Sequence, residues 1–113
     1  MRIQSYRFGE IVIEGTTYSD DVIVFADRVQ AGWWRQEGHV LQVEDLKEAL
    51  EGELEVLVVG TGTQQGMTVA SEVVSHTKNA GIELLAFDTR MACQMFNELV
   101  GKRKVVAVLH LTC

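Results

Sequence analysis

Residues 54–62 read LEVLVVGTG, an apolar run that ends in a glycine-rich turn. Nearly continuous apolar sequence is typical of a β-strand that is covered on both faces. Residues 82–87 (IELLAF) and 105–109 (VVAVL) repeat this pattern further along the chain. The second half of the protein is therefore predicted to contain three buried strands.

Two amphipathic segments separate these strands, and both are predicted to be helices. Residues 68–79 are followed by Gly81 and residues 90–100 by Gly101, and glycine commonly ends a helix. Apolar side chains recur at spacings of three and four, so one stripe of each helix should face the sheet. The stripes comprise Val69, Ala70, Val73, Val74 and Thr77 in the first helix and Met91, Ala92, Met95, Phe96 and Leu99 in the second.

The first half of the chain reads as short antiparallel strands. Residues 6–13 and 22–25 are predicted strands, and residues 14–17 have the composition of a hairpin turn. Residues 29–35 are predicted to be extended, and residues 44–51 to form a short helix with acidic residues in its first turn. We therefore expect an α/β fold in which the N-terminal strands extend the sheet or form a second layer.

The composition is that of one soluble domain. Of the 113 residues, 47% are hydrophobic and 23% are charged, and no apolar stretch approaches the ~18 residues of a membrane-spanning helix. A net charge of −6 disfavours nucleic acid and anionic membranes as partners. The N-terminus does not read as a signal peptide, and the two cysteines, Cys93 and Cys113, fit reduced thiols. We expect residues 1–113 to form a single cytoplasmic domain.

The glycine-rich turn is the first candidate site. In a strand, turn and helix order, the backbone N–H groups of Gly60, Thr61, Gly62 and Thr63 would point toward one spot at the helix N-terminus. This arrangement predicts an anion site for a phosphate or a carboxylate. The stretch matches neither the dinucleotide fingerprint nor the P-loop, because Gly66 comes one position late and no lysine follows it.

The turn after the next predicted strand should lie at the same sheet edge. It contains Asp88, Thr89 and Arg90, so Arg90 would stand beside the anion site. Simpler interpretations remain open for both turns. Gly60 and Gly62 would then serve only to turn the chain tightly, and Asp88 or Thr89 would cap the following helix.

Trp33 and Trp34 are candidate partner-binding residues. Neighbouring residues of an extended strand point to opposite faces, so at most one of the two can lie in the same core layer. The other would then be available to a protein partner. The alternative is that flanking elements cover both indoles.

No catalytic or metal-binding constellation is visible. His110 and Cys113 are three residues apart, so on a strand they would point to opposite faces and meet only if the chain curls away from extended geometry. His39 and His76 share no metal-ligand spacing with either cysteine. We therefore predict no catalytic residues, no metal site and no cofactor.

A set of ordered short motifs resembles the adipogenesis-associated Mth-type domain family. The motifs are Phe8-Gly9, Trp33-Trp34-Arg35, Val59-Gly60-Thr61-Gly62, Gly81-Ile82, Asp88-Thr89 with Ala92-Cys93, Phe96-Asn97 and Leu99, Lys102-Arg103 with Val105-Val106-Ala107, and His110-Leu111-Thr112-Cys113. That family belongs to a class of unknown function that also includes a mitochondrial respiratory complex I assembly factor. The resemblance implies a compact layered α/β sandwich with a mixed central sheet, and no established enzymatic activity.

Two functional hypotheses follow. The first is a non-catalytic module that binds a protein partner or assists assembly, with Trp33 or Trp34 at its contact surface. The second is a protein or enzyme that binds a small anion at the loop of Gly60, Thr61, Gly62 and Thr63, with Arg90 nearby.

Overall fold

The architecture is given by a computed structural model that describes residues 1–113. Its elements run in the order β1 (Ile3–Arg7), β2 (Glu10–Ile13), β3 (Thr16–Tyr18), β4 (Val22–Val24), β5 (Val29–Ala31), β6 (Val40–Leu41), the 3-10 helix η1 (Val43–Leu46), β7 (Val56–Gly60), β8 (Thr68–Val69), α1 (Ser71–Asn79), β9 (Glu83–Phe87), α2 (Thr89–Leu99) and β10 (Val105–Leu109).

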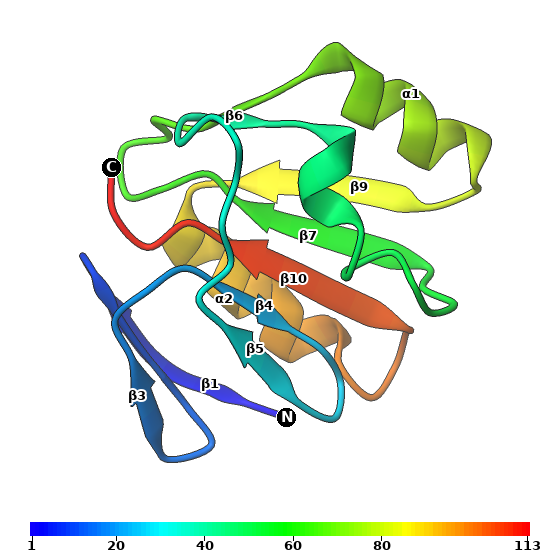
Figure 1. Ribbon diagram of the computed structural model, residues 1–113. Helices are drawn as coiled ribbons and strands as arrows, with labels where there is room; N and C mark the ends of the chain where they lie inside the picture. The colour runs from blue at the N-terminus through cyan, green and yellow to red at the C-terminus, as the bar shows by residue number, and fades with distance from the viewer.

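A mixed five-stranded sheet forms the middle of the molecule, with strand order β5-β4-β10-β7-β9 (Figure 1). The pairs β10–β7 and β7–β9 are parallel, whereas β4 pairs antiparallel with both β10 and β5. β10 occupies the central position, and all five of its residues are buried. The predicted α/β fold with a mixed central sheet is thereby confirmed.

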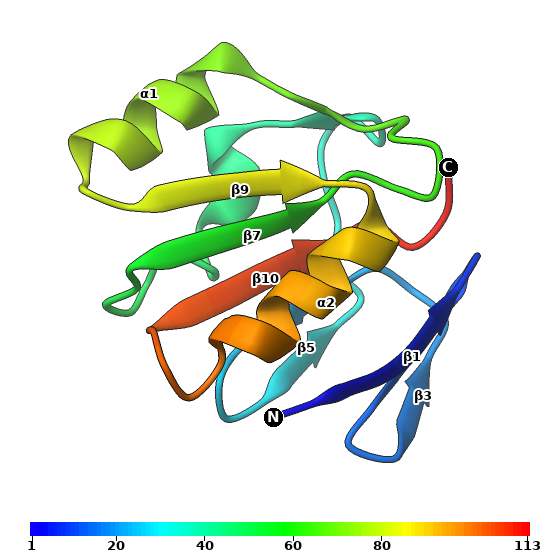
Figure 2. The same cartoon turned by 180° about the vertical axis from the view of Figure 1, so that it is seen from behind.

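The two faces of this sheet are covered by different elements. Along β7, Val56 and Val58 point into a cluster with Phe96 of α2 and Ile11 of β2, because side chains alternate along a strand. Leu57 and Val59 point into a second cluster on the opposite face, which is covered by the loop between β5 and β6 and by η1. Figure 2 shows α2 lying across the sheet, with the separate antiparallel sheet β1-β2-β3 beside it. The result is a layered sandwich.

The N-terminal prediction was wrong in one respect. Residues 6–13 do not form a single strand, because the chain turns at Gly9, where φ is +76° and glycine is favoured. β1 and β2 therefore pair with each other as a hairpin. The predicted hairpin turn is found at Gly15, and β3 begins directly after it.

Two further elements of the first half are shorter than predicted. The extended segment 29–35 ends as a strand at Ala31, because Gly32 turns the chain with φ +68°. The predicted helix over residues 44–51 consists of the single 3-10 turn η1.

The second half confirms the three strands but changes their surroundings. The strand predicted over residues 82–87 is β9, which lies at the edge of the sheet, so Glu83 and Ala86 are exposed. The first helix begins at Ser71 and not at residue 68, because the chain first pairs with β6 through β8. Of the two apolar stripes, Val74 and Met91 are exposed.

A matched pair of substitutions on α2 tests which side of this helix carries the fold. Phe96 is fully buried between the sheet and β1, whereas Met91 is exposed. Phe96→Ala should lower the free energy of unfolding by about 3–5 kcal/mol, because it leaves a cavity. Met91→Ala should change it by about 0.5 kcal/mol. Urea denaturation measures both, and equal losses would contradict the assigned packing.

Candidate functional site

The glycine-rich loop after β7 uses its backbone donors inside the protein. Thr61 N–H donates to the carbonyl oxygen of Phe87 at 2.9 Å, and Thr63 N–H to that of Thr112 at 2.7 Å. Gly62 N–H donates to Oγ1 of Thr89 at 2.8 Å. No helix starts at this loop, because β8 precedes α1, so the predicted strand, turn and helix order was wrong. Anion binding here stays a prediction, with fewer free donors than the sequence suggested.

Glycine is required in this loop by close packing against the last residues of the chain. Gly62 has φ +107°, and a Cβ atom on it would lie 2.5 Å from the carbonyl carbon of Cys113. A Cβ on Gly60 would lie 2.9 Å from Cδ2 of Leu109. The two glycines therefore let residues 109–113 cross directly over the end of β7.

The turn after β9 divides its residues between two tasks. Asp88 caps α2, as predicted, because its Oδ1 accepts the N–H of Met91 at 3.0 Å. Thr89 is buried, and its hydroxyl donates to the carbonyl oxygen of His110 at 2.6 Å. These contacts join the edges of β7, β9 and β10.

Arg90 lies apart from the loop amides. Its guanidinium lies 5.6 Å from the centroid of the Tyr6 ring, and it lines a hollow of about 250 Å³ between β1 and α2. Tyr6 in turn hydrogen-bonds through its hydroxyl to Thr63. Tyr6 thus contacts both Thr63 and Arg90, and neither Gly60 nor Gly62 lines the hollow beside Arg90.

The two tryptophans have opposite environments, which is one of the two outcomes that the sequence left open. Trp33 is buried, and its indole N–H donates to the carbonyl oxygen of Asp45 at 2.9 Å. Trp34 is 82% exposed. Both lie in the loop after β5 and not in a strand.

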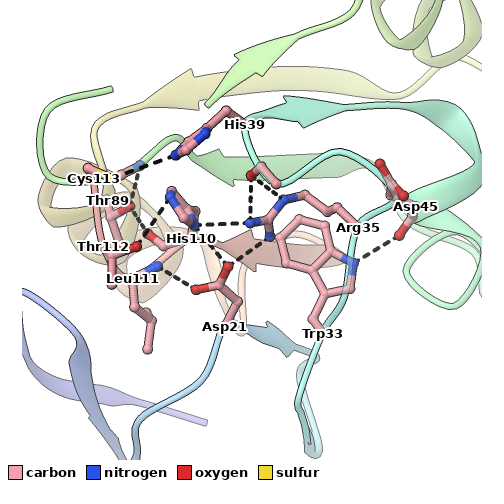
Figure 3. A network of polar contacts seen from close by, with 12 residues as sticks. Asp21, Trp33, Arg35, His39, Asp45, Thr89, His110, Leu111, Thr112 and Cys113 are labelled. Atoms are coloured by element: carbon pink, nitrogen blue, oxygen red, sulfur yellow. Dashed lines mark hydrogen bonds and ion pairs between the residues drawn. The ribbon is translucent and has the colours of Figure 1, made fainter. Parts of the chain in front are cut away.

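A buried charge network supports this loop (Figure 3). Asp21 directly precedes β4, and its Oδ2 lies 2.8 Å from both Nδ1 of His110 and Nη1 of Arg35. Its Oδ1 accepts the N–H of Leu111 at 2.7 Å. Burial raises the pKa of Asp21, but the hydrogen bonds from His110, Leu111 and Arg35 outweigh burial and hold that pKa below its ordinary value.

Arg35 connects this network to the buried Trp33 ring and to the backbone at Gly38. Its side chain is only 6% exposed, and its guanidinium stacks 4.8 Å from the Trp33 ring centroid. Nε and Nη2 both donate to the carbonyl oxygen of Gly38, at 3.0 and 2.8 Å. Arg35 therefore fixes the loop on both sides of its own position.

The structure also brings together donors that the sequence spacing kept apart. β10 ends at Leu109, and beyond it side-chain donor atoms of His110 and Cys113 lie within 4.8 Å of one another and of that of His39. Sγ of Cys113 and Nε2 of His39 lie 3.7 Å apart. The other thiol, Cys93, is a buried residue of α2, and burial raises its pKa to about 12.

Sequence reasoning missed the roles of Asp21, Arg35 and His39. A weak signal was available in Asp21, because a carboxylate directly before an apolar strand needs a partner when that strand is central. Neither Arg35 nor His39 carries such a signal, since their partners are remote along the chain.

Comparison with known protein families identifies the family of this chain. A family model described as a protein of unknown function (DUF498/DUF598) matches residues 3–110. The chain belongs to this family. The resemblance to the Mth-type domain class is confirmed by the family and by a structural neighbour that is itself described as a Mth938-like domain.

Three solved structures show how closely the DUF498/DUF598 fold is shared. A conserved hypothetical protein from Pyrococcus horikoshii OT3 is 27% identical, with 100% of each chain covered and a TM-score of 0.86. An outer membrane protein from Bartonella henselae is 23% identical, covering 98% of this chain and 94% of that one, with a TM-score of 0.80. The Mth938-like domain from Bordetella pertussis is 23% identical, covering 97% and 85%, with a TM-score of 0.77.

Neither helix of this DUF498/DUF598 member has the length and apolar character needed to cross a bilayer. The longer one, α2, has 11 residues.

Substitution of Gly62 tests the close crossing. Gly62→Ala combines a left-handed φ with a Cβ placed against the backbone of Cys113, so the free energy of unfolding should fall by about 3 kcal/mol. Gly52→Ala is the matched control, because a Cβ there meets nothing within 4 Å. Urea denaturation of both variants measures the difference, and a similar small loss in both would contradict the crossing.

Asp21→Asn tests the charge network through pH. A carboxyl whose folded pKa lies below its ordinary value of 3.8 stabilises the protein above that pH, and this stability is lost as the pH falls through the folded pKa. The variant should lose about 3 kcal/mol near neutral pH, because Arg35 keeps its charge in a buried position. Its unfolding free energy should also depend less on pH in the acid range than that of the wild type.

The neighbouring Asp20, which is exposed, supplies the control for this experiment. Asp20→Asn should keep both the stability and the pH slope of the wild type, measured by urea titration at a series of pH values. A wild-type slope in Asp21→Asn would show that the carboxylate does not carry the acid dependence.

Proposed function

We propose that this domain is a non-catalytic binding module that recognises a protein partner through Trp34. The observation that carries the proposal is an indole that is 82% exposed while both of its chain neighbours are anchored. Tryptophan is enriched among the interface residues that dominate binding energy. Trp34 is therefore the natural centre of a contact surface.

The anchoring of Trp33 and Arg35 favours binding in a second way. The buried indole of Trp33 holds the chain before Trp34, and the ion pair of Arg35 with Asp21 holds the chain after it. A side chain presented on a fixed backbone loses less conformational entropy on association than one on a mobile loop. The buried polar groups thus support the presentation of Trp34.

Two hollows flank Trp34 and suggest the chemistry of the partner. One of about 300 Å³ is lined by Asp20 and Thr112, and the other of about 400 Å³ is lined by Glu44 and Glu48. Asp20, Glu44 and Glu48 are exposed carboxylates on a chain with a net charge of −6. A partner segment that combines an apolar pocket for the indole with lysine or arginine side chains would complement this surface.

The same charge and the absence of a membrane-spanning helix agree with a location in the cytoplasm, which we propose.

Binding of a small anion at the loop of Gly60 and Gly62 is the alternative function. It has weaker support, because the amides of residues 61–63 already have protein acceptors.

Trp34→Ala tests the proposal, with Phe8→Ala as a matched control. Both side chains are large, apolar and exposed, but Phe8 lies at the turn between β1 and β2. Immobilised wild-type domain captures proteins from the cytosol, and the dissociation constant of each captured protein is then measured with the purified variants. Trp34→Ala should weaken binding about 30-fold, which corresponds to ~2 kcal/mol, and Phe8→Ala should leave it nearly unchanged.

Neutralising two exposed carboxylates beside Trp34 provides the second arm of this test. Glu44→Gln with Glu48→Gln should slow association with the same partner, because exposed interface charges act mainly on the association rate. Circular dichroism and the melting temperature verify folding. Equal affinity of the wild type and Trp34→Ala for every captured protein would refute Trp34 as the contact residue.

A further inference from the structure

We infer that His39, His110 and Cys113 form a binding site for a thiophilic divalent transition-metal ion of the Zn²⁺ class. Their donor atoms lie within 4.8 Å of one another, and they come from the loop before β6 and from the segment after β10 (Figure 3). This site is distinct from the Trp34 surface, since none of the three residues lines either hollow beside that indole.

The spacing of the donors is close to that of a tetrahedral site. Zn–N bonds of about 2.0–2.1 Å and Zn–S bonds of about 2.3 Å place two tetrahedral ligand atoms ~3.5 Å apart. Sγ of Cys113 and Nε2 of His39 are already 3.7 Å apart. The rings of His39 and His110 stand at 87° with centroids 5.9 Å apart, so the two imidazoles approach the same space from different directions.

His110 is held in the tautomer that a metal ion requires. Its Nδ1 lies 2.8 Å from Oδ2 of Asp21, which only accepts, and 3.1 Å from Nη2 of Arg35, which only donates. The carboxylate contact is the shorter one, and Nη2 already donates to the carbonyl oxygen of Gly38, so we assign the proton to Nδ1. Nε2 then bears the lone pair, and Oγ1 of Thr112 lies 3.5 Å from it. A carboxylate that orients a histidine through its second nitrogen is the usual outer shell of a zinc ligand.

The backbone of the other two ligands is also fixed. The carbonyl oxygen of Cys113 accepts the N–H of Gly66 at 2.6 Å, and that of His39 accepts the N–H of Thr68 at 2.8 Å. The side chains of His39 and Cys113 are themselves exposed, so an ion can reach them from solvent. Binding would need small side-chain rotations and no rearrangement of the chain.

The donor set selects the class of metal. Two imidazoles and a thiolate suit Zn²⁺ and other thiophilic transition metals, whereas Mg²⁺ and Ca²⁺ require oxygen ligands. Three protein ligands also leave a fourth tetrahedral position for water or an external ligand.

Metal titration of the full chain, free of any oligohistidine tag, tests the inference. Zn²⁺ affinity is measured by competition with a chromophoric chelator, and Co²⁺ serves as the spectroscopic probe because thiolate ligation produces a charge-transfer absorption. We expect one ion per chain and a thiolate band. His39→Ala and Cys113→Ser should each weaken Zn²⁺ at least 10-fold, and Cys113→Ser should abolish the band.

Two further variants test the selectivity of the site and the role of Asp21. His76→Ala removes an exposed histidine on α1 and should keep the wild-type affinity. Asp21→Asn should weaken Zn²⁺ about 10–100-fold through His110 while leaving the thiolate band in place. Wild-type affinity in either His39→Ala or Cys113→Ser, or a Co²⁺ complex without a thiolate band, would overturn the site. The capture of protein partners by Trp34 is measured separately, so failure of one proposal does not decide the other.

Discussion

The polar edge of the sheet, where β4 begins and β10 ends, depends on the carboxylate of Asp21. It joins the start of β4 to the side chain of His110, to the backbone of Leu111 and to the guanidinium of Arg35. Each of these groups is buried or nearly so, and a buried charge is stable only when it is paired and hydrogen-bonded. The orientation of His110 and the position of the Trp34 loop therefore share one electrostatic origin.

At this polar edge the apolar packing on the two faces of the sheet gives way to polar contacts. Alternation along β7 and β10 sends one set of side chains toward α2 and the N-terminal hairpins and the other toward the loop and the 3-10 helix. At the ends of these strands the apolar layers stop, and residues 110–113 cross over Gly62 and Gly66. The Trp34 loop and the proposed metal site thus lie beside the ends of the sheet strands.

Much of the fold could be predicted from local sequence, whereas little of the polar edge could be. Composition predicts β7 and β10, and periodicity predicts the helix that Asp88 caps, each from no more than a dozen residues of sequence. Asp21 and His110 are 89 positions apart, and His39 and Cys113 are 74 apart, so no spacing rule connects them. The glycine-rich loop misled for the same reason, because the acceptors of its amides are remote.

The central place of β10 has a consequence for how the protein is made. This strand pairs with β4 on one side and β7 on the other, yet it follows every other element along the chain. While a ribosome is still synthesising it, the nascent polypeptide has two half-sheets with unsatisfied edges and no strand to join them. Such edges are prone to aberrant pairing with other chains, and they are closed only when β10 inserts between β4 and β7.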